Sequence, residues 1–179
     1  LLTTVCCSQT VVKPGGNLQA VLDKGEDLLL QKGAVYEVRE TLRYTRPGQK
    51  ILTPGARLMA DYATLRIADT NLMQAIDAGG VSGAVLKNVI VDGNRYALST
   101  VPKTGEGGGG QPPLVFFGGA GAVNQQVCGN VMMNTRTWST LKVHEGATNI
   151  LVEANIILGA GVDPRGNGRE VNETPFGWG

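Results

Sequence analysis

Three segments of this chain share one frame, in which an asparagine follows a glycine by nine positions. They span residues 79–88, 121–130 and 146–155, and apolar residues surround the asparagines Asn88, Asn130 and Asn155. The second and third copies are 25 residues apart, and the first precedes the second by 42 residues. A repeat of this length, built from short β-prone runs and polar turns, is typical of a β-solenoid. We expect the three asparagines to stack at one place in the coil and to hydrogen-bond the backbone of the turns.

Composition and charge support this interpretation and exclude several classes of partner. The chain has 179 residues, a formal net charge of +1, 26 glycines and 5% aromatic residues. The length suits a single domain over residues 1–179, and abundant glycine favours a fold that turns every few residues over a helical bundle. A nearly neutral chain offers no basic surface for nucleic acid, and no apolar run approaches the roughly 20 residues of a membrane span. We therefore expect neither nucleic-acid nor membrane partners.

A short helix is predicted over residues 17–24, after the turn Lys13-Pro14-Gly15-Gly16. Asn17 is a good N-cap, apolar residues follow on one face, and Gly25 is a stop signal. An amphipathic helix at the start of a solenoid covers the open end of its apolar core. The sequence thus predicts an N-terminal capping helix.

Two stretches interrupt the repeat, residues 94–113 and 159–179. Both contain many glycines and polar residues, and we expect long loops there, on the side of the solenoid that commonly binds ligands. The first insertion accounts for the spacing of 42 residues between the first two copies. After residues 156–158 no further coil or cap is recognisable, which predicts a C-terminally truncated fragment whose open last coil associates end to end.

Residues 1–10 and the cysteines bear on the compartment. The apolar start, followed by Cys6 and Ser8, fits either the tail of a secretory signal or an ordinary first strand. Three cysteines, an odd number without metal-ligand spacing, do not decide between these alternatives. Asn172-Glu173-Thr174 is a glycosylation sequon, which is compatible with an extracellular protein.

Three segments of the chain resemble the pectate-lyase-like family of right-handed parallel β-helix proteins. Residues 12–22 and 28–36 are similar to the opening of that family, with a capping helix before the first coils, and residues 86–95 resemble its recurrent coil. The resemblance implies an all-β fold: a single-stranded, right-handed parallel β-helix (β-solenoid) with an N-terminal capping α-helix. Its catalytic signatures are absent, both the Asn-Thr-Asp, Asp-Asp and Gly-His-Gly sets of polygalacturonases and the Arg-x-Pro-x-x-Arg pattern of pectate lyases. The resemblance therefore implies the fold and does not extend to one activity.

The segment 139–146 is the best candidate for catalysis. Side chains alternate across a strand, so if Leu141 and Val143 face the core, Lys142 and His144 face outward together. His144 is the only histidine of the chain, and a group that titrates near neutrality suits a general base. The equally simple alternative is that these residues are solvated outward positions of a regular coil.

Other residues extend this candidate site. Removal of a proton next to a uronate carboxylate also needs cations, which Lys142, Arg136 or Arg165 would supply. Asp77 precedes Gly79 by two positions as His144 precedes Gly146, so we expect the two side chains to share one groove. Trp138 and Trp178 are candidate platforms for a sugar ring, or else pack beneath the loops.

Calcium is a possible cofactor, because oxygen ligands suit it. Its candidate ligands, which lack any fixed spacing, are Asp163, Glu170 and Glu173.

Taken together, the resemblance and the candidate site favour an extracellular, carbohydrate-active protein, a polysaccharide lyase or glycoside hydrolase that acts on an acidic polysaccharide. The alternative is a non-catalytic β-helix that binds glycans or has a structural role at a surface.

Overall fold

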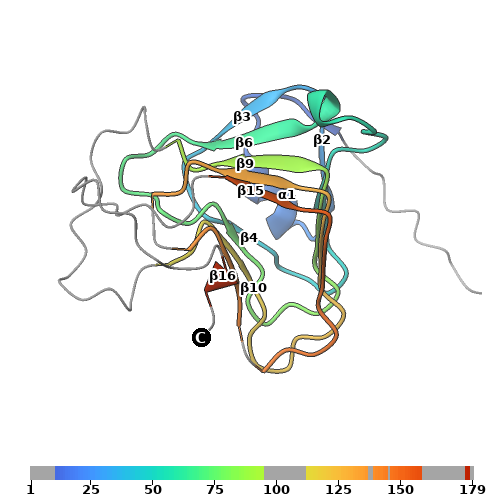
Figure 1. Cartoon of the computed structure of the whole chain (residues 1–179). Coiled ribbons are helices and arrows are strands. Elements are labelled where there is room, and N and C mark those ends of the chain that lie inside the picture. Colours follow the sequence, from blue (N-terminus) through green and yellow to red (C-terminus); the bar gives the residue numbers. More distant parts are fainter. Residues whose placement is uncertain (1–10, 95–111, 137–138, 145, 159–175, 178–179) are drawn as a thin grey trace, which may run out of the picture.

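The computed structural model describes residues 11–94, 112–136, 139–144, 146–158 and 176–177 (Figure 1). Their strands form three sheets, in which every paired strand is parallel to its neighbour. Sheet A contains, in spatial order, β1 (Val11–Val12), β2 (Leu28–Leu30), β5 (Lys50–Leu52), β8 (Val85–Lys87), β11 (Gln126–Cys128) and β14 (Leu151–Glu153). Sheet B contains β3 (Val35–Val38), β6 (Ala63–Ile67), β9 (Val89–Asp92), β12 (Val131–Met133) and β15 (Ile156–Leu158). Sheet C contains β4 (Leu42–Arg43), β7 (Ile76–Asp77), β10 (Val115–Phe117), β13 (Leu141–Val143) and β16 (Phe176–Gly177).

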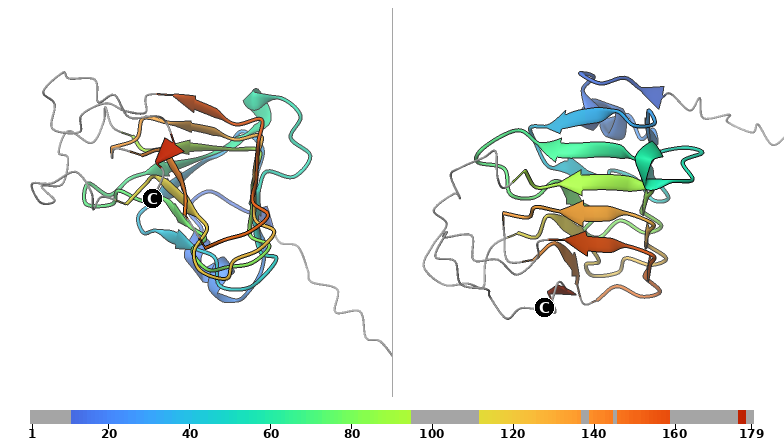
Figure 2. Two further views of the ribbon diagram at one scale, coloured as in Figure 1. Left: turned by 60° about the horizontal axis from the view of Figure 1, so that its bottom comes forward. Right: turned by 45° about the horizontal axis from the view of Figure 1, so that its top comes forward.

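The chain visits the three sheets in turn, so successive coils stack on one another (Figure 2). From β2 onward, each coil contributes one strand to sheet A, one to sheet B and one to sheet C. Parallel pairing of β8 with β11 and of β9 with β12 joins the first two copies of the sequence frame. The repeat therefore predicted correctly that the chain forms an all-β stack of parallel coils.

The spacing in residue number along one column of sheet A gives the length of each coil. Its residues, which pair in register, are Leu28, Ile51, Leu86, Val127 and Val152. The successive differences between these residue numbers are 23, 35, 41 and 25. The shortest spacings fall within the roughly 22 to 28 residues expected for a coil without insertions. The longer ones include a connection that carries the 3-10 helix η1 (Met59–Asp61) and the segment 95–111, which lies outside the described residues.

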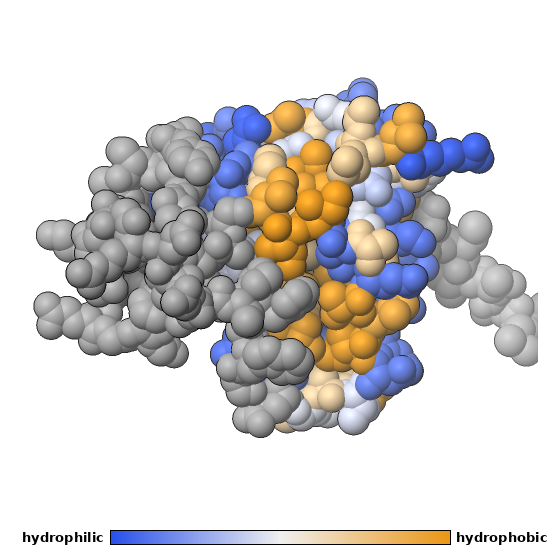
Figure 3. Space-filling model, viewed as in Figure 1, coloured by the Kyte–Doolittle hydropathy of each residue, from blue (hydrophilic) through white to orange (hydrophobic). Residues whose placement is uncertain are grey.

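The last coil carries more exposed apolar surface than the coils before it. Its exposed residues are Leu151, Val152, Ile156 and Leu158. Figure 3 shows apolar residues gathered on the face where β15 lies in Figure 1.

Residues 176–177 form β16, which pairs with β13, although this stretch was expected to belong to a loop. A strand of two residues is too short for an alternating pattern to reveal it.

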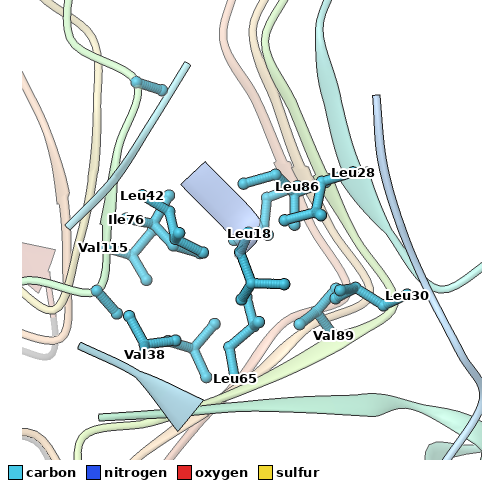
Figure 4. Close-up of a cluster of buried hydrophobic side chains, with 14 of the residues drawn as sticks. Leu18, Leu28, Leu30, Val38, Leu42, Leu65, Ile76, Leu86, Val89 and Val115 are labelled. Carbon is cyan, nitrogen blue, oxygen red and sulfur yellow. The ribbon is translucent and has the colours of Figure 1, made fainter. Parts of the chain in front are cut away.

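The core lies between the three sheets, and each sheet directs aliphatic side chains into it. Figure 4 shows residues from all three sheets converging, among them Leu86, Leu65 and Ile76, each of which is fully buried. Leu18, from the helix α1 (Leu18–Asp23), joins the same cluster.

Both ends of α1 agree with the sequence. The Asn17 side chain accepts a hydrogen bond from the backbone N–H of Ala20 (2.9 Å), as an N-cap does. After the helix, Gly25 has a positive φ of 73°, and its N–H donates to the carbonyl of Leu22 (2.8 Å). Leu18 and Leu22 are buried, so the predicted apolar face of the helix packs against the first coil.

The register corrects the expected alignment of the three asparagines. Asn88 lies in register with Gly129 and not with Asn130, because Lys87 pairs with Cys128. Asn88 and Gly129 have positive φ values of 55° and 66°. Since glycine and asparagine both adopt this conformation readily, the sequence frame concealed a shift of one residue.

Asn130 and Asn155 do stack, as expected. The Asn130 N–H donates to Oδ1 of Asn155 (3.0 Å), and the Val89 N–H donates to Oδ1 of Asn130 (3.1 Å). Their Nδ2 groups donate to the carbonyls of Leu86 and Val127 in the preceding coils (3.0 and 2.7 Å). Each amide thus joins two coils at the corner between sheets A and B.

Candidate functional site

The outward face of sheet C brings together the candidate residues that the structure describes. Its central column, in register, consists of Arg43, Asp77, Phe116 and Lys142. Leu141 is buried and Val143 packs against the core, so the alternation along β13 places Lys142 on the outward face. His144 directly follows the strand. We call these five residues, the column together with His144, the sheet C face.

Phe116 lies at the centre of this face, and the sequence analysis did not identify it. Its ring centroid is 5.9 Å from that of His144, with an angle of 58° between the planes. On the other side, a Cβ placed on Gly79 would lie 3.0 Å from Cε1 of Phe116, so the glycine gives the ring its room. The sequence did contain a signal for it, the adjacent pair Phe116-Phe117. Because side chains alternate across a strand, only one of the two can face the core, and the other must face outward. Phe117 is the buried one.

The register corrects the expected equivalence of Asp77 and His144. Asp77 pairs with Phe116, which pairs with Lys142, so Asp77 shares its column with Lys142. His144 follows Val143, which pairs with Phe117, and therefore lies beside Gly118. A Cβ on Gly118 would approach the carbonyl oxygen of His144 to 2.6 Å. Only glycine permits this close approach, which was not evident from the sequence frame.

The charges of the face are arranged around the phenyl ring. Oδ1 of Asp77 accepts a hydrogen bond from the Gly79 N–H (2.9 Å), and Oδ2 lies 3.8 Å from Nε of Arg43. Lys142 lies on the opposite side of Phe116 from Asp77 along the column. An aromatic surface is therefore flanked by an anionic and a cationic side chain.

Arg136 does not lie on this face. Its side chain is 1% exposed, and its guanidinium donates to the carbonyls of Leu72 (3.1 Å) and Thr70 (2.6 Å), between β6 and β7. Burial lowers the pKa of this guanidinium, an effect that the nearby Asp69 opposes. The expectation of a solvent-facing cation at this position is wrong, because loop carbonyls enclose it. Arg136 holds a connection between sheets B and C.

Several predicted residues cannot be placed. Trp138, Arg165 and Trp178 lie outside the described residues, as do the candidate calcium ligands Asp163, Glu170 and Glu173 and the sequon residue Asn172. Within the described part of the chain, no group of three or more His, Cys, Asp or Glu side chains is arranged to hold a metal ion. Within that same part, no helix has the length and apolar character needed to cross a membrane.

Comparisons with known proteins found no match to a family model, to a curated protein or to a solved structure.

Proposed function

We propose that this chain is an extracellular, right-handed parallel β-helix of the pectate-lyase-like kind, capped by α1, whose sheet C face binds an acidic polysaccharide. The observation that carries the proposal is the position of Phe116 beside His144 and in one column with Lys142. An aromatic ring with polar neighbours is the usual platform for the apolar face of a sugar. A flanking cation suits the carboxylate of a uronate residue.

The geometry also suits a chain-like ligand. Neighbouring strands of a sheet are about 5 Å apart, so Arg43, Phe116 and Lys142 form a row that crosses the coils. A polysaccharide laid along this row contacts one side chain from each coil. Asp77, held by Arg43 and by the Gly79 N–H, is available to accept hydrogen bonds from sugar hydroxyls.

The second candidate function is cleavage of the same polymer by β-elimination. The specific observation is that His144 and Lys142 both lie beside Phe116: Lys142 is in register with it, and the His144 ring centroid is 5.9 Å from that of Phe116. Neutral His144 would take the proton from the carbon next to the uronate carboxylate, while Lys142 stabilises the negative charge that develops there. The electron pair then forms a carbon–carbon double bond and expels the glycosidic oxygen, which takes up a proton. Hydrolysis is less well supported, because it needs two carboxyl groups across the bond, and Asp77 is the one carboxylate of the sheet C face.

The test is binding to soluble uronate polymers, polygalacturonate and alginate, with dextran as the neutral control. We expect Phe116→Ala and Lys142→Gln each to weaken binding by about tenfold. Lys87→Gln is the matched control, since Lys87 is an exposed lysine that faces outward from sheet A, and it should bind like the wild type. Equal loss in Lys87→Gln and Lys142→Gln, or no binding to either uronate polymer, contradicts the proposal.

The same preparations separate binding from cleavage. An unsaturated uronate product absorbs in the ultraviolet, so β-elimination is followed directly on the polymer. If the protein is a lyase, His144→Ala loses this signal and still binds polymer. If the wild type binds and never produces the signal, the protein is a non-catalytic glycan-binding module.

A further inference from the structure

At the N-terminal end of the stack, each sheet ends in an edge. The three edges differ in what covers them. In sheet A, β1 pairs with β2 and adds one extra layer. In sheet C, the Gln19 side chain covers β4: its Oε1 accepts from the Arg43 N–H (2.8 Å), and its Nε2 donates to the Arg43 carbonyl (3.2 Å). In sheet B, β3 pairs with β6, and no other described strand pairs with it.

The direction of the backbone groups shows which ones are left at this edge. In a parallel strand, alternate residues direct their N–H and C=O groups to opposite sides. The carbonyls of Ala34 and Val38 accept from the N–H groups of Thr64 (2.8 Å) and Ala68 (2.9 Å), on the side of β6. The N–H and C=O groups of Val35 and Glu37 therefore point to the edge that β6 does not cover.

A groove of about 490 Å³ runs along this edge, between β3 and the start of α1. Its lining includes Asn17, Leu18 and Gln19 at the start of α1 and Val35, Tyr36 and Glu37 of β3. In Figure 2, β3 is the outermost strand of sheet B, and α1 lies beyond it. Val35 is 47% exposed, so the groove is open on its outer side, whereas Tyr36 and Val38 point inward and are buried.

We propose that this groove binds an extended segment of a partner protein, which adds a parallel or antiparallel strand to sheet B. The partner's backbone pairs with the N–H and C=O groups of Val35 and Glu37, as in other cases of strand addition to a sheet edge. Partner side chains next to Tyr36 and Val38 point inward and are apolar. Those next to Val35 and Glu37 face solvent and are polar. The ligand is thus a short peptide with apolar residues at alternate positions.

The layer that β1 adds argues for a single inserted strand over a second copy of the chain. A copy stacked head to tail on this end would place its last strands beyond β1 in sheet A. Since each strand occupies about 5 Å along the stack, a gap of one strand would remain over β3. One extended segment fills that gap without disturbing β1 or Gln19.

The first experiment is amide hydrogen exchange by NMR on the full chain, with a synthetic peptide as the probe. The probe is acetyl-Lys-Thr-Val-Thr-Val-Thr-Lys-amide, and its control carries N-methyl groups on alternate residues, which remove the donors of one edge. In the free protein the amides of Val35 and Glu37 should exchange fast while those of Tyr36 and Val38 exchange slowly. The probe should protect Val35 and Glu37, and the methylated control should not. Protection of Val35 and Glu37 in the free protein would overturn the proposal, because the chain would then cover this edge itself.

The second experiment compares two variants at one position. Glu37→Pro removes the N–H that faces the groove and spares the bonds to β6, and the extended residue before it tolerates proline. It should weaken probe binding by about tenfold or more, whereas Glu37→Thr, which keeps the N–H, should bind within about twofold of the wild type. Unchanged binding by Glu37→Pro, or a requirement to delete residues 1–10 before the probe binds, overturns the proposal. If Glu37→Pro does not fold, the exchange of Val35 and Glu37 in the wild type decides the question.

Discussion

At the scale of the residue, one corner of the stack depends on a backbone conformation that few residue types adopt. Five positions, each three residues before the aligned column of sheet A, have positive φ values of 73°, 73°, 67°, 60° and 56°; they are Gly25, Gly48, Gly83, Asn124 and Asn149. In the last two coils, asparagine replaces glycine, and Nδ2 of Asn149 donates to Oδ1 of Asn124 (2.5 Å). Asparagine thus meets the same backbone requirement and adds a contact between coils.

Asn130, which stacks on Asn155, and Asn88, which lies in register with Gly129, predict mutational effects of different size. Asn130→Ala should lower the free energy of unfolding by about 2–3 kcal/mol, because buried partners on Leu86 and Val89 lose their hydrogen bonds. Asn88→Gly should lower it by no more than about 1 kcal/mol, because glycine adopts the positive φ readily and only the bond from Nδ2 to the Ala56 carbonyl (3.3 Å) is lost. Urea denaturation measures both values. Equal losses in the two variants would show that the asparagines are equivalent after all.

Tyr44 predicts a loss of stability at alkaline pH. Burial raises the pKa of its phenol well above 10, and the nearby Asp27 adds to the shift. Because the folded-state pKa lies above the unfolded value of about 10, the contribution of Tyr44 is fully present below pH 10. It should decline as pH rises from there toward the folded-state pKa. Denaturation midpoints measured across this range should fall more steeply for the wild type than for Tyr44→Phe; parallel curves contradict the assignment.

At the scale of the element, connections and first strands are held by single side chains that reach across coils. Gln49 and Gln125 are fully buried at the corner between sheets C and A. Gln49 donates to the carbonyls of Leu22 (2.9 Å) and Glu26 (2.7 Å), and Gln125 donates to those of Ala78 (2.8 Å) and Val81 (2.9 Å). These side-chain amides bond backbone groups that have no neighbouring strand to pair with, as the Gln19 side chain does for Arg43 of β4.

Arg136 belongs to the same group, and its substitution should affect stability more than binding. Arg136→Lys should lower the free energy of unfolding by about 2–3 kcal/mol, because one ammonium cannot reproduce the bonds to the carbonyls of Leu72 and Thr70. Arg39→Lys, at an exposed ion pair with Glu37, is the control and should cost less than about 0.5 kcal/mol. Thermal denaturation measures both. A normal melting curve of Arg136→Lys combined with weaker uronate binding would restore Arg136 to the binding site.

The elements differ in how far the sequence could predict them. The ends of α1 were predictable, because Asn17 and Gly25 act on their own neighbours in the chain. The burial of Arg136 was not, since its carbonyl partners precede it by 64 to 67 residues. The position of Phe116 within the sheet C face depended on a register that a slip of one residue would have inverted.

At the scale of the whole molecule, the two ends of the stack are unequal. Leu28 and Val127, in the aligned column of sheet A, are fully buried, whereas Val152 in the last coil is 37% exposed. Apolar surface of this kind at the end of a sheet favours association. Since stacking on the opposite end leaves a gap over β3, two last coils should meet each other in a closed dimer.

This surface predicts self-association through the last coil. The wild type should show a concentration-dependent dimer in sedimentation velocity, and Val152→Lys should be monomeric, because a buried lysine disfavours the contact. Val35→Lys is the control, since Val35 is 47% exposed at the other end of the stack. A wild type that stays monomeric at all concentrations would contradict the prediction, and so would a dimer that persists in Val152→Lys.

The order of pairing also bears on how the chain is made. Every strand from β5 onward has a partner earlier in the chain, beginning with β2 for β5 and β3 for β6. During synthesis from the N-terminus, each coil that emerges therefore meets a finished edge onto which it can add. Because α1 and β1 precede the first coil in the chain, their contacts with β4 and β2 can form before any later coil has been made.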